Sequence, residues 1–331
     1  MTESETAYLY PSDSLPEVSV VVPMFNEVEN VLLMLTALQE ALHGLTHEII
    51  LVDDGSTDGT IARAWQTKVP FVRIVEMMRN YGQTSAMAAG IQEARGEYVV
   101  TLDGDLQNDP ADIPLMLEKA RREDWDVVAG RRANRQDGWL LRKIPSQLAN
   151  AMIRRLTGVY LYDYGCTLKV FRRTIAQNLG LYGELHRFIP VLADIQGARM
   201  TEMDVRHHPR RFGKSKYGLG RTTKVLSDLL LMVYFQRWMK KPMHLFGPLG
   251  GLLLLGGVGT MFFQLLASLG VGSGSGVALM TGMILTISGL LFLSLGIFAE
   301  IQMRIYYEHQ SKTPYSIRKI HEVPSPQPQY H

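Results

Sequence analysis

The chain has 331 residues, which is enough for one large domain and an appendage. Its formal net charge of +2 argues against a nucleic-acid-binding surface. Its one cysteine, Cys166, excludes an intrachain disulfide, and the sequence has no Cys/His cluster of the kind that binds zinc. These features exclude a disulfide-stabilised secreted domain and indicate a cytosolic compartment.

Residues 1–16 precede the first periodic segment. They contain acidic residues, prolines and serines, but no basic stretch followed by an apolar core. This composition is not that of a signal peptide. We expect residues 1–16 to form a flexible leader.

Residues 17–131 alternate short β-branched runs with amphipathic segments of helical length. The strand-like runs are EVSVVVP, EIILVDD, FVRIVEM, EYVVTLD and DVVAGRR. Strands that alternate with helices predict an α/β fold with a mostly parallel sheet. Ligands of such sheets bind beyond the carboxyl ends of the strands. Polar residues follow the first, second and fourth runs and are candidate site residues: Asn26, Glu27, Asp53, Asp54, Asp103 and Asp105.

The fourth run leads into DGDLQNDP, which contains Asp103, Asp105 and Gln107. Two carboxylates at positions i and i+2 of a strand end can turn toward one hard cation, to which Gln107 could add a carbonyl oxygen. Mg²⁺ or Mn²⁺ would keep open positions for diphosphate oxygens. A D-x-D pattern alone is more often a solvated turn. Three acidic strand ends in one sheet favour a ligand site instead.

Beyond Arg131 the alternation loosens. The sequence predicts a helix rich in basic residues at about 138–157, a strand at CTLKVFRR and a helix at HRFIPVLADIQG. FGKSKYG has neither helical nor strand periodicity, so we expect a loop there. Residues 221–241 combine basic and apolar residues in an amphipathic pattern, which predicts an interfacial helix.

Residues 242–299 contain no Asp, Glu, Lys or Arg. Two apolar runs, at about 243–268 and 277–299, predict two transmembrane helices, with a buried hairpin of a soluble core as the less favoured alternative. Basic residues flank both runs, so we expect both ends in the cytoplasm. The remaining residues, 301–331, are expected to form a cytoplasmic tail with a disordered end.

Seven motifs, taken in order, resemble family 2 of the GT-A glycosyltransferases over about residues 17–220. They are VVVPMFNE, VDDGSTDGT, RNYGQTSAMAAG, LDGDLQNDP, GRR, DYGCTLKVFRR and KSKYG. Within that family they resemble the polyisoprenyl-phosphate glycosyltransferases, such as dolichyl-phosphate mannose synthase and bactoprenol glucosyltransferase. The resemblance implies a Rossmann-like GT-A domain and inverting, Mg²⁺- or Mn²⁺-dependent transfer of one sugar from a nucleotide donor to a polyisoprenyl phosphate.

The resemblance also implies three groups of site residues. The nucleotide site falls on Pro23, Asn26, Glu27, Asp53, Asp54, Gly82 and Asp103, and the metal site on Asp103, Asp105 and Gln107. The acceptor phosphate falls on Arg131, Arg132, Arg211, Lys214, Ser215 and Lys216. Asp163 is expected to join Asp103 and Asp105 in catalysis by orienting the acceptor or its arginine partners, with a buried structural salt bridge as the alternative. Gln83 stands where the family often has a second glycine.

The two predicted spans are similar to those of the bactoprenol glucosyltransferase and aminoarabinose transferase branch. This similarity implies an enzyme of the bacterial plasma membrane that transfers glucose from UDP-glucose to undecaprenyl phosphate for cell-envelope glycan modification. Mannose, galactose or aminoarabinose are the alternatives, and an inactive membrane-anchored protein that binds lipid phosphate or nucleotide is the rival class. The first span contains small residues that permit helices to associate, so a homo-oligomer is one possible state of the protein. These residues are Gly250, Gly251, Gly256 and Gly259.

Overall fold

The computed structural model describes most of the chain in two compact units. The described residues are 15–132, 151–210 without 152, 156 and 184, then 212, 234, 238, 241–269, 275–308 and 317–322. The first unit consists of residues 1–229 and 313–331, and the second of residues 230–312. Most of the predicted leader, of the basic helix at 138–157 and of the interfacial helix at 221–241 lies outside the described residues.

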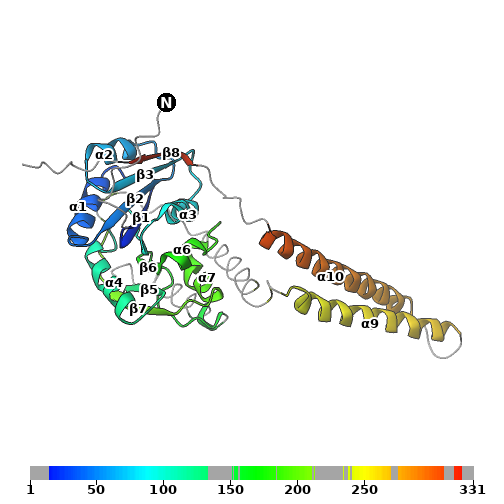
Figure 1. Cartoon of the computed structure of the whole chain (residues 1–331). Coiled ribbons are helices and arrows are strands. Elements are labelled where there is room, and N and C mark those ends of the chain that lie inside the picture. Colours follow the sequence, from blue (N-terminus) through cyan, green and yellow to red (C-terminus); the bar gives the residue numbers. More distant parts are fainter. Residues whose placement is uncertain are drawn as a thin grey trace, which may run out of the picture. The chain divides into compact units, whose positions relative to one another are not determined.

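The first unit contains an eight-stranded sheet in the order β7-β5-β6-β4-β1-β2-β3-β8 (Figure 1). The strands are β1 (Val18–Met24), β2 (His47–Asp53), β3 (Val72–Met77), β4 (Tyr98–Thr101), β5 (Val127–Arg132), β6 (Lys169–Arg172), β7 (Met200–Val205) and β8 (Ile317–Glu322). The β1–β2, β1–β4, β2–β3 and β5–β7 pairs are parallel, while β6 and β8 run antiparallel to their neighbours. The predicted mostly parallel α/β sheet is confirmed.

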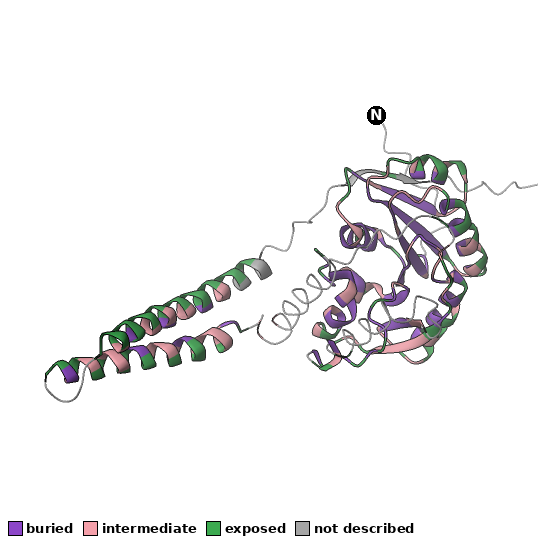
Figure 2. Ribbon diagram, turned by 180° about the vertical axis from the view of Figure 1, so that it is seen from behind, coloured by how far each residue is buried: buried purple, intermediate pink, exposed green. Residues whose placement is uncertain are grey.

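Helices cover both faces of this sheet. They are α1 (Val31–Ala41), α2 (Thr60–Gln66), α3 (Gln83–Glu93), η1 (Pro110–Asp112), α4 (Ile113–Arg122), α6 (Arg173–Gln177), η3 (Leu185–Phe188) and α7 (Ile189–Ile195). Alternate residues of β1 point to opposite faces. Val20 and Val22 join a core formed with α1 and α4, whereas Val21 joins a second core formed with α3, α6 and α7. The central strands are therefore buried on both sides (Figure 2).

The strand β8 was not predicted from the sequence. It comes from the segment expected to be a tail and pairs antiparallel with β3 at the edge of the sheet. The register of this pairing shifts between Glu76 and Met77, just before the loop that leads to α3. The chain therefore returns to the first unit after it has formed the second.

The second unit is a pair of long apolar helices, α9 (Met243–Ser268) and α10 (Gly276–Glu308). Both are long and apolar enough to cross a membrane, and few of their residues are buried in the protein (Figure 2). A hairpin in the core of a soluble protein would bury most of these side chains, whereas a bilayer solvates them. The two apolar spans predicted from the sequence are therefore present as helices.

Glycines bring α9 and α10 into close contact. Five of them recur at intervals of seven residues within their helix: Gly250 and Gly257 on α9, and Gly282, Gly289 and Gly296 on α10. A Cβ atom added at Gly257 would lie 2.4 Å from Thr286 Oγ1, and one added at Gly289 would lie 2.5 Å from the backbone N of Leu254. The helices can pack this closely only because these positions lack side chains.

Candidate active site

The carboxyl ends of β1, β2 and β4 lie next to one another, because β1 is hydrogen bonded to both of the other strands. The β1–β2 ladder includes Pro23 and ends at Asp53, and the β1–β4 ladder ends at Thr101. The polar residues that follow these strands are therefore brought to one edge of the sheet, as the sequence predicted. This edge is where ligands of open α/β sheets bind.

Asp53 has one oxygen atom that the protein leaves without a partner. Its Oδ2 accepts hydrogen bonds from the backbone N of Gly55 at 3.1 Å and of Ser56 at 3.0 Å. Its Oδ1 is buried and has no hydrogen-bond partner in the protein. Burial raises the pKa of Asp53. A buried acceptor of this kind is costly unless a ligand donates to it, and an N–H group of a nucleobase would do so.

Asp54 has a different task from its neighbour. Its Oδ1 accepts a hydrogen bond from the backbone N of Tyr81 at 2.7 Å, and its Oδ2 accepts one from Gly82 at 2.9 Å. Gly82 has a φ of 93°, which favours glycine. Both carboxylate oxygens of Asp54 therefore fix the loop before α3, and its part in nucleotide binding stays a prediction.

Asn26 and Glu27 connect the end of β1 to the loop after β2. Asn26 has a φ of 52°, its backbone N donates to Ser56 Oγ at 2.8 Å, and its Oδ1 accepts from the backbone N of Thr57 at 2.8 Å. The carboxylate of Glu27 accepts a hydrogen bond from Asn30 Nδ2 at 2.6 Å. These bonds hold the two strand ends together beside the open oxygen of Asp53.

The four acidic residues after β4 fall into two pairs with different surroundings. Asp109 and Asp112 bind the segment after β7: Arg206 Nε donates to Asp112 Oδ1 at 2.9 Å, and His208 Nε2 lies 3.2 Å from Asp109 Oδ2. The backbone O of Gln107 accepts from the same segment. Asp109 and Asp112 therefore have structural partners on that segment, whereas the other pair directly follows β4.

That other pair is Asp103 and Asp105. Gln83 Nε2 donates to Asp103 Oδ1 at 2.7 Å, and Arg210 Nη2 donates to Asp105 Oδ2 at 2.6 Å. Gln83, which departs from the family pattern, thus orients an acidic side chain of the site. Burial and the charge of Asp105 raise the pKa of Asp103 to about 6.

A divalent cation fits this acidic pair. Among the described residues, no three His, Cys, Asp or Glu side chains form a group that could hold a metal ion. Mg²⁺ needs no such cage, because it is usually bound by one or two carboxylates together with water and substrate phosphates. Burial and the charge of Asp105 disfavour the ionised form of Asp103 and raise its pKa, and a cation bound between the two carboxylates would favour that form. Gln107 lies partly exposed two residues beyond Asp105.

Arg132 and Asp163, which the sequence predicted on the acceptor side, form a bidentate ion pair. Arg132 Nε donates to Asp163 Oδ2 at 2.7 Å, and Arg132 Nη2 donates to Asp163 Oδ1 at 2.8 Å. Burial opposes ionisation of Asp163, but Arg132 holds its pKa below the usual range. Arg131 instead pairs with Asp204, with Nη2 2.8 Å from Oδ2. Four further predicted residues lie outside the described part of the chain: Arg211, Lys214, Ser215 and Lys216.

Lys169, which the sequence did not single out, lies buried in this region. It is on β6, between β5 with Arg132 and β4, and its Nζ donates to the backbone O of Cys166. Burial lowers the pKa of Lys169, while the charges of Asp163 and Asp103 oppose that shift. The one signal in the sequence was a lysine within the otherwise apolar run TLKVF. Lys169 connects the acceptor-side pair electrostatically to Asp103.

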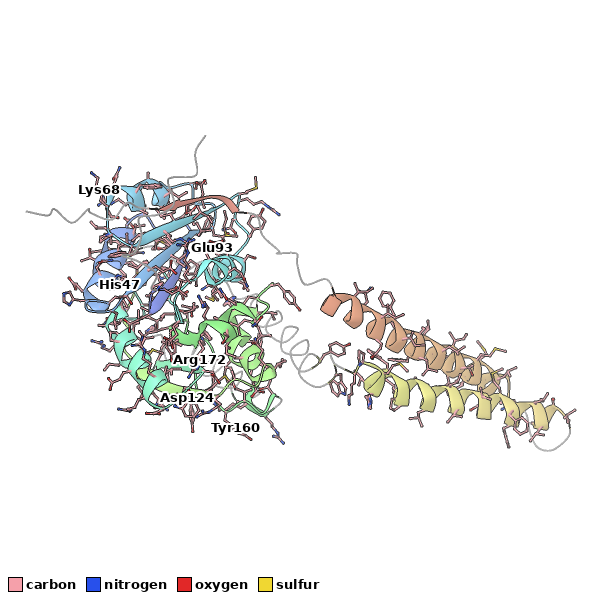
Figure 3. The ribbon with its side chains drawn as sticks, in the orientation of Figure 1. His47, Lys68, Glu93, Asp124, Tyr160 and Arg172 are labelled. Carbon is pink, nitrogen blue, oxygen red and sulfur yellow. The ribbon has the colours of Figure 1, made fainter. Side chains whose placement is uncertain are left out.

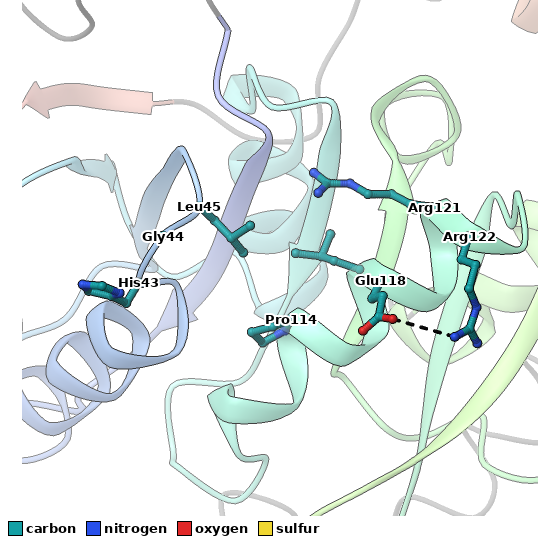
Figure 4. A pocket seen from close by; sticks show the side chains of 8 residues that line it. His43, Gly44, Leu45, Pro114, Glu118, Arg121 and Arg122 are labelled. Atoms are coloured by element: carbon teal, nitrogen blue, oxygen red, sulfur yellow. Dashed lines mark ion pairs between the residues drawn. The ribbon is translucent and has the colours of Figure 1, made fainter.

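A separate pocket of about 610 Å³ lies between α4 and the turn from α1 to β2 (Figure 4). It is lined by residues that include His43, Leu45 and Pro114, and by the ion pair of Glu118 and Arg122. His43 and Leu45 precede the first residue of β2. The pocket is therefore near the amino end of that strand, away from Asp53.

Comparison with known proteins identifies the family. Residues 19–180 match the model of glycosyl transferase family 2. The chain is 44% identical to dodecaprenyl-phosphate galacturonate synthase of Rhizobium johnstonii over 94% of its own length and 94% of that protein. The chain belongs to glycosyltransferase family 2. This confirms the predicted family and the prediction that the protein is a glycosyltransferase.

Other relatives of this glycosyltransferase agree. It is 37% identical to undecaprenyl-phosphate 4-deoxy-4-formamido-L-arabinose transferase of Serratia proteamaculans, over 93% of this chain and 95% of that protein. Both named relatives act on a polyprenyl phosphate by name, so the predicted resemblance to that branch is confirmed. The crystal structure of glucosyl-3-phosphoglycerate synthase from Mycobacterium tuberculosis with Mg²⁺ and UDP superposes with a TM-score of 0.52 at 18% identity, covering 66% of this chain and 79% of that one. The catalytic unit therefore has the fold of that enzyme.

Proposed function

We propose that this glycosyltransferase moves one sugar from a nucleotide donor to the phosphate of a polyprenyl phosphate, with inversion, at the cytoplasmic face of a bacterial plasma membrane. The observation that carries the proposal is that polar residues gather at one edge of the sheet. Asp103 and Asp105 follow β4, and Arg132 is the last residue of β5. Asp53 is the last residue of β2, and its Oδ1 has no hydrogen-bond partner in the protein. The identities of 44% and 37% to enzymes named for polyprenyl phosphates support the acceptor.

On the donor side, Asp53 Oδ1 would accept a hydrogen bond from the base. Asp54 holds the loop before α3 through the backbone N–H groups of Tyr81 and Gly82, so the first turn of α3 would offer its own N–H groups to the diphosphate. Asp103 and Asp105 would hold Mg²⁺ or Mn²⁺, with Gln107 as a third ligand. When bound, the ion stabilises the negative charge that develops on the departing nucleoside diphosphate. Pro23, Asn26 and Glu27 complete the proposed nucleotide site.

On the acceptor side, the nucleophile needs no strong general base. A phosphate monoester has a second pKa near 6, so its oxygen is already ionised at neutral pH. The main obstacle is the approach of two anions, which cations overcome. We assign Arg131, Arg132, Arg211, Lys214, Ser215 and Lys216 to the acceptor phosphate. Asp163 positions Arg132 with both carboxylate oxygens and takes no proton.

We propose galacturonate as the transferred sugar, because the chain shares 44% identity with an enzyme named for it. Membranes containing the full-length protein should make a lipid-linked sugar from UDP-galacturonate and undecaprenyl phosphate. Parallel reactions with UDP-glucose and with the nucleotide form of 4-deoxy-4-formamido-L-arabinose test the sugar expected from the sequence and that of the second relative. Chromatography of radiolabelled lipid extracts measures the product. Transfer of glucose alone would contradict this sugar and keep the reaction class.

The proposed topology places both ends of the α9–α10 hairpin in the cytoplasm. Two features support it: basic residues flank both helices, and β8 returns the chain to the unit that holds β1. A Ser273→Cys variant in sealed membranes should react with a charged maleimide only from the periplasmic side. The wild-type protein is the blank, because Cys166 is buried. Labelling of Ser273→Cys from the cytoplasmic side alone would contradict the topology.

A further inference from the structure

A short loop segment, residues 159–163, presents two tyrosines outward beside the proposed acceptor site. Val159, Leu161 and Asp163 are buried, whereas Tyr160 and Tyr162 are 83% and 66% exposed. Tyr160 projects from the end of the catalytic unit opposite Lys68 (Figure 3). Alternation places residues 160 and 162 on the outer face, where a surface in contact with water usually has charged or small polar residues.

Hydrogen bonds fix this segment to the acceptor site. The backbone N atoms of Tyr162 and Asp163 donate to the carboxylate of Glu202 at 2.8 and 3.0 Å. The hydroxyl of Tyr164 donates to the backbone O of Val159, which closes the segment on itself. The carboxylate of Asp163 binds Arg132, as described above. The two outward rings are therefore held at a set position relative to the proposed acceptor-phosphate site.

Two arginines lie against one of the exposed rings. The guanidinium groups of Arg131 and Arg154 lie 5.5 and 5.4 Å from the centre of the Tyr162 ring, and Arg155 is exposed nearby in the chain. Among the described residues, the acids beside them, apart from Asp163 in its pair with Arg132, are Glu202, which binds backbone N–H groups, and Asp204, which binds Arg131. Within this described set, three arginines against two acids leave one excess positive charge next to Tyr162. Aromatic rings with a polar tip, beside cations, are enriched where proteins meet lipid headgroups.

We propose that this aromatic patch, Tyr160 and Tyr162 with Arg131, Arg154 and Arg155, docks the catalytic unit on the surface of an anionic bilayer. The two rings lie at the depth of the headgroups, so the adjoining Asp163–Arg132 pair meets a lipid phosphate without the lipid leaving the bilayer. The inference goes beyond the proposed reaction and rests on its lipid acceptor. The proposal identifies the surface around Tyr160 and Tyr162 as the face of the catalytic unit that contacts the membrane.

The test uses the full-length protein in nanodiscs of phosphatidylcholine and phosphatidylglycerol. A Tyr160→Cys variant is labelled with an environment-sensitive fluorophore, and nitroxide-bearing lipids serve as quenchers. The matched control is Lys68→Cys, an exposed position at the other end of the same unit. We expect strong quenching at position 160 and none at position 68. Equal exposure of both labels to aqueous iodide, without lipid quenching, would overturn the proposal.

Cross-linking of two Tyr160→Cys chains without lipid quenching would also overturn it, in favour of a contact between copies of the protein. Because the quenching is measured without substrates, its result is independent of whether the proposed transfer reaction is correct. If quenching occurs and no sugar is transferred, the docking face stands and the proposed function fails.

A kinetic comparison adds a second readout. The double variant Tyr160→Ser/Tyr162→Ser should raise the KM for the polyprenyl phosphate by about tenfold, because it removes two interfacial rings. The KM for the sugar nucleotide should stay unchanged. Tyr160→Trp/Tyr162→Trp keeps the aromatic character and should behave as the wild type. An unchanged acceptor KM in the serine variant, with the protein folded, would contradict the proposed docking.

Discussion

Replacing Asp103 or Asp105 by Asn is expected to lower turnover by about 10²- to 10³-fold while the protein stays folded. Asn keeps the shape of the side chain but removes the charge that would hold a divalent cation. The loss should appear in kcat, because the developing charge on the leaving diphosphate is greatest in the transition state. Transfer of radiolabelled sugar to lipid in membranes measures the rate, and thermal unfolding in detergent checks the fold.

The same segment offers a matched control. Asp109 lies near the two site residues in the chain, but its carboxylate faces His208 and Arg206. Asp109→Asn should therefore keep turnover within a few-fold of the wild type. Near-normal turnover of both Asp103→Asn and Asp105→Asn, or full activity in a chelator, would show that the acidic pair does not bind a required metal.

Arg73→Met should lower the free energy of unfolding of the catalytic unit by about 3 to 5 kcal/mol. Arg73 is buried on β3, and its guanidinium lies 3.2 Å from Glu48 Oε2 and 2.9 Å from Glu93 Oε2. Glu48 is buried too, and it also accepts hydrogen bonds from Ser19 Oγ and from the backbone N of Arg95. Removing Arg73 leaves the carboxylate of Glu48 buried without its cation. Denaturant titration in detergent measures the change.

Two further variants separate this explanation from a general effect of mutation. In the double variant Arg73→Met/Glu48→Gln the uncompensated charge is gone, so much of the stability should return. Arg122→Ala breaks the exposed pair with Glu118 that Figure 4 shows, and it should cause no measurable change. An unfolding midpoint of Arg73→Met equal to that of the wild type would contradict a stabilising role of the buried network.

The centre of the sheet was predictable because its strands are buried on both faces and so appear as nearly continuous apolar runs. The position of Asp53 and Asp103 followed from the same pattern, since carboxyl ends of neighbouring parallel strands share an edge. Their individual roles did not follow. Asp105 and Asp109 both meet the segment after β7, about a hundred residues further along the chain, and only the structure shows that Asp105 faces Arg210 while Asp109 faces His208.

Other features depend on contacts that a linear pattern does not contain. Lys169 interrupts an otherwise apolar strand, but only the placement of β6 between β4 and β5 shows that its ammonium is buried. Asp54 has the same side chain as Asp53 but meets the backbone of the loop before α3. The strand β8 owes its structure to the free edge of β3 rather than to its own short sequence, which mixes basic and apolar residues.

The pairing of β8 with β3 also has a mechanical consequence. The chain leaves the catalytic unit before α9 and rejoins it after α10, so the hairpin is a closed loop with two attachment points rather than a pendant on one linker. A catalytic unit attached to the hairpin by one linker could rotate freely about that linker. A second attachment restricts this rotation. Cutting the chain between α10 and β8 would therefore let the catalytic unit rotate about its remaining linker, without removing any residue of the candidate active site.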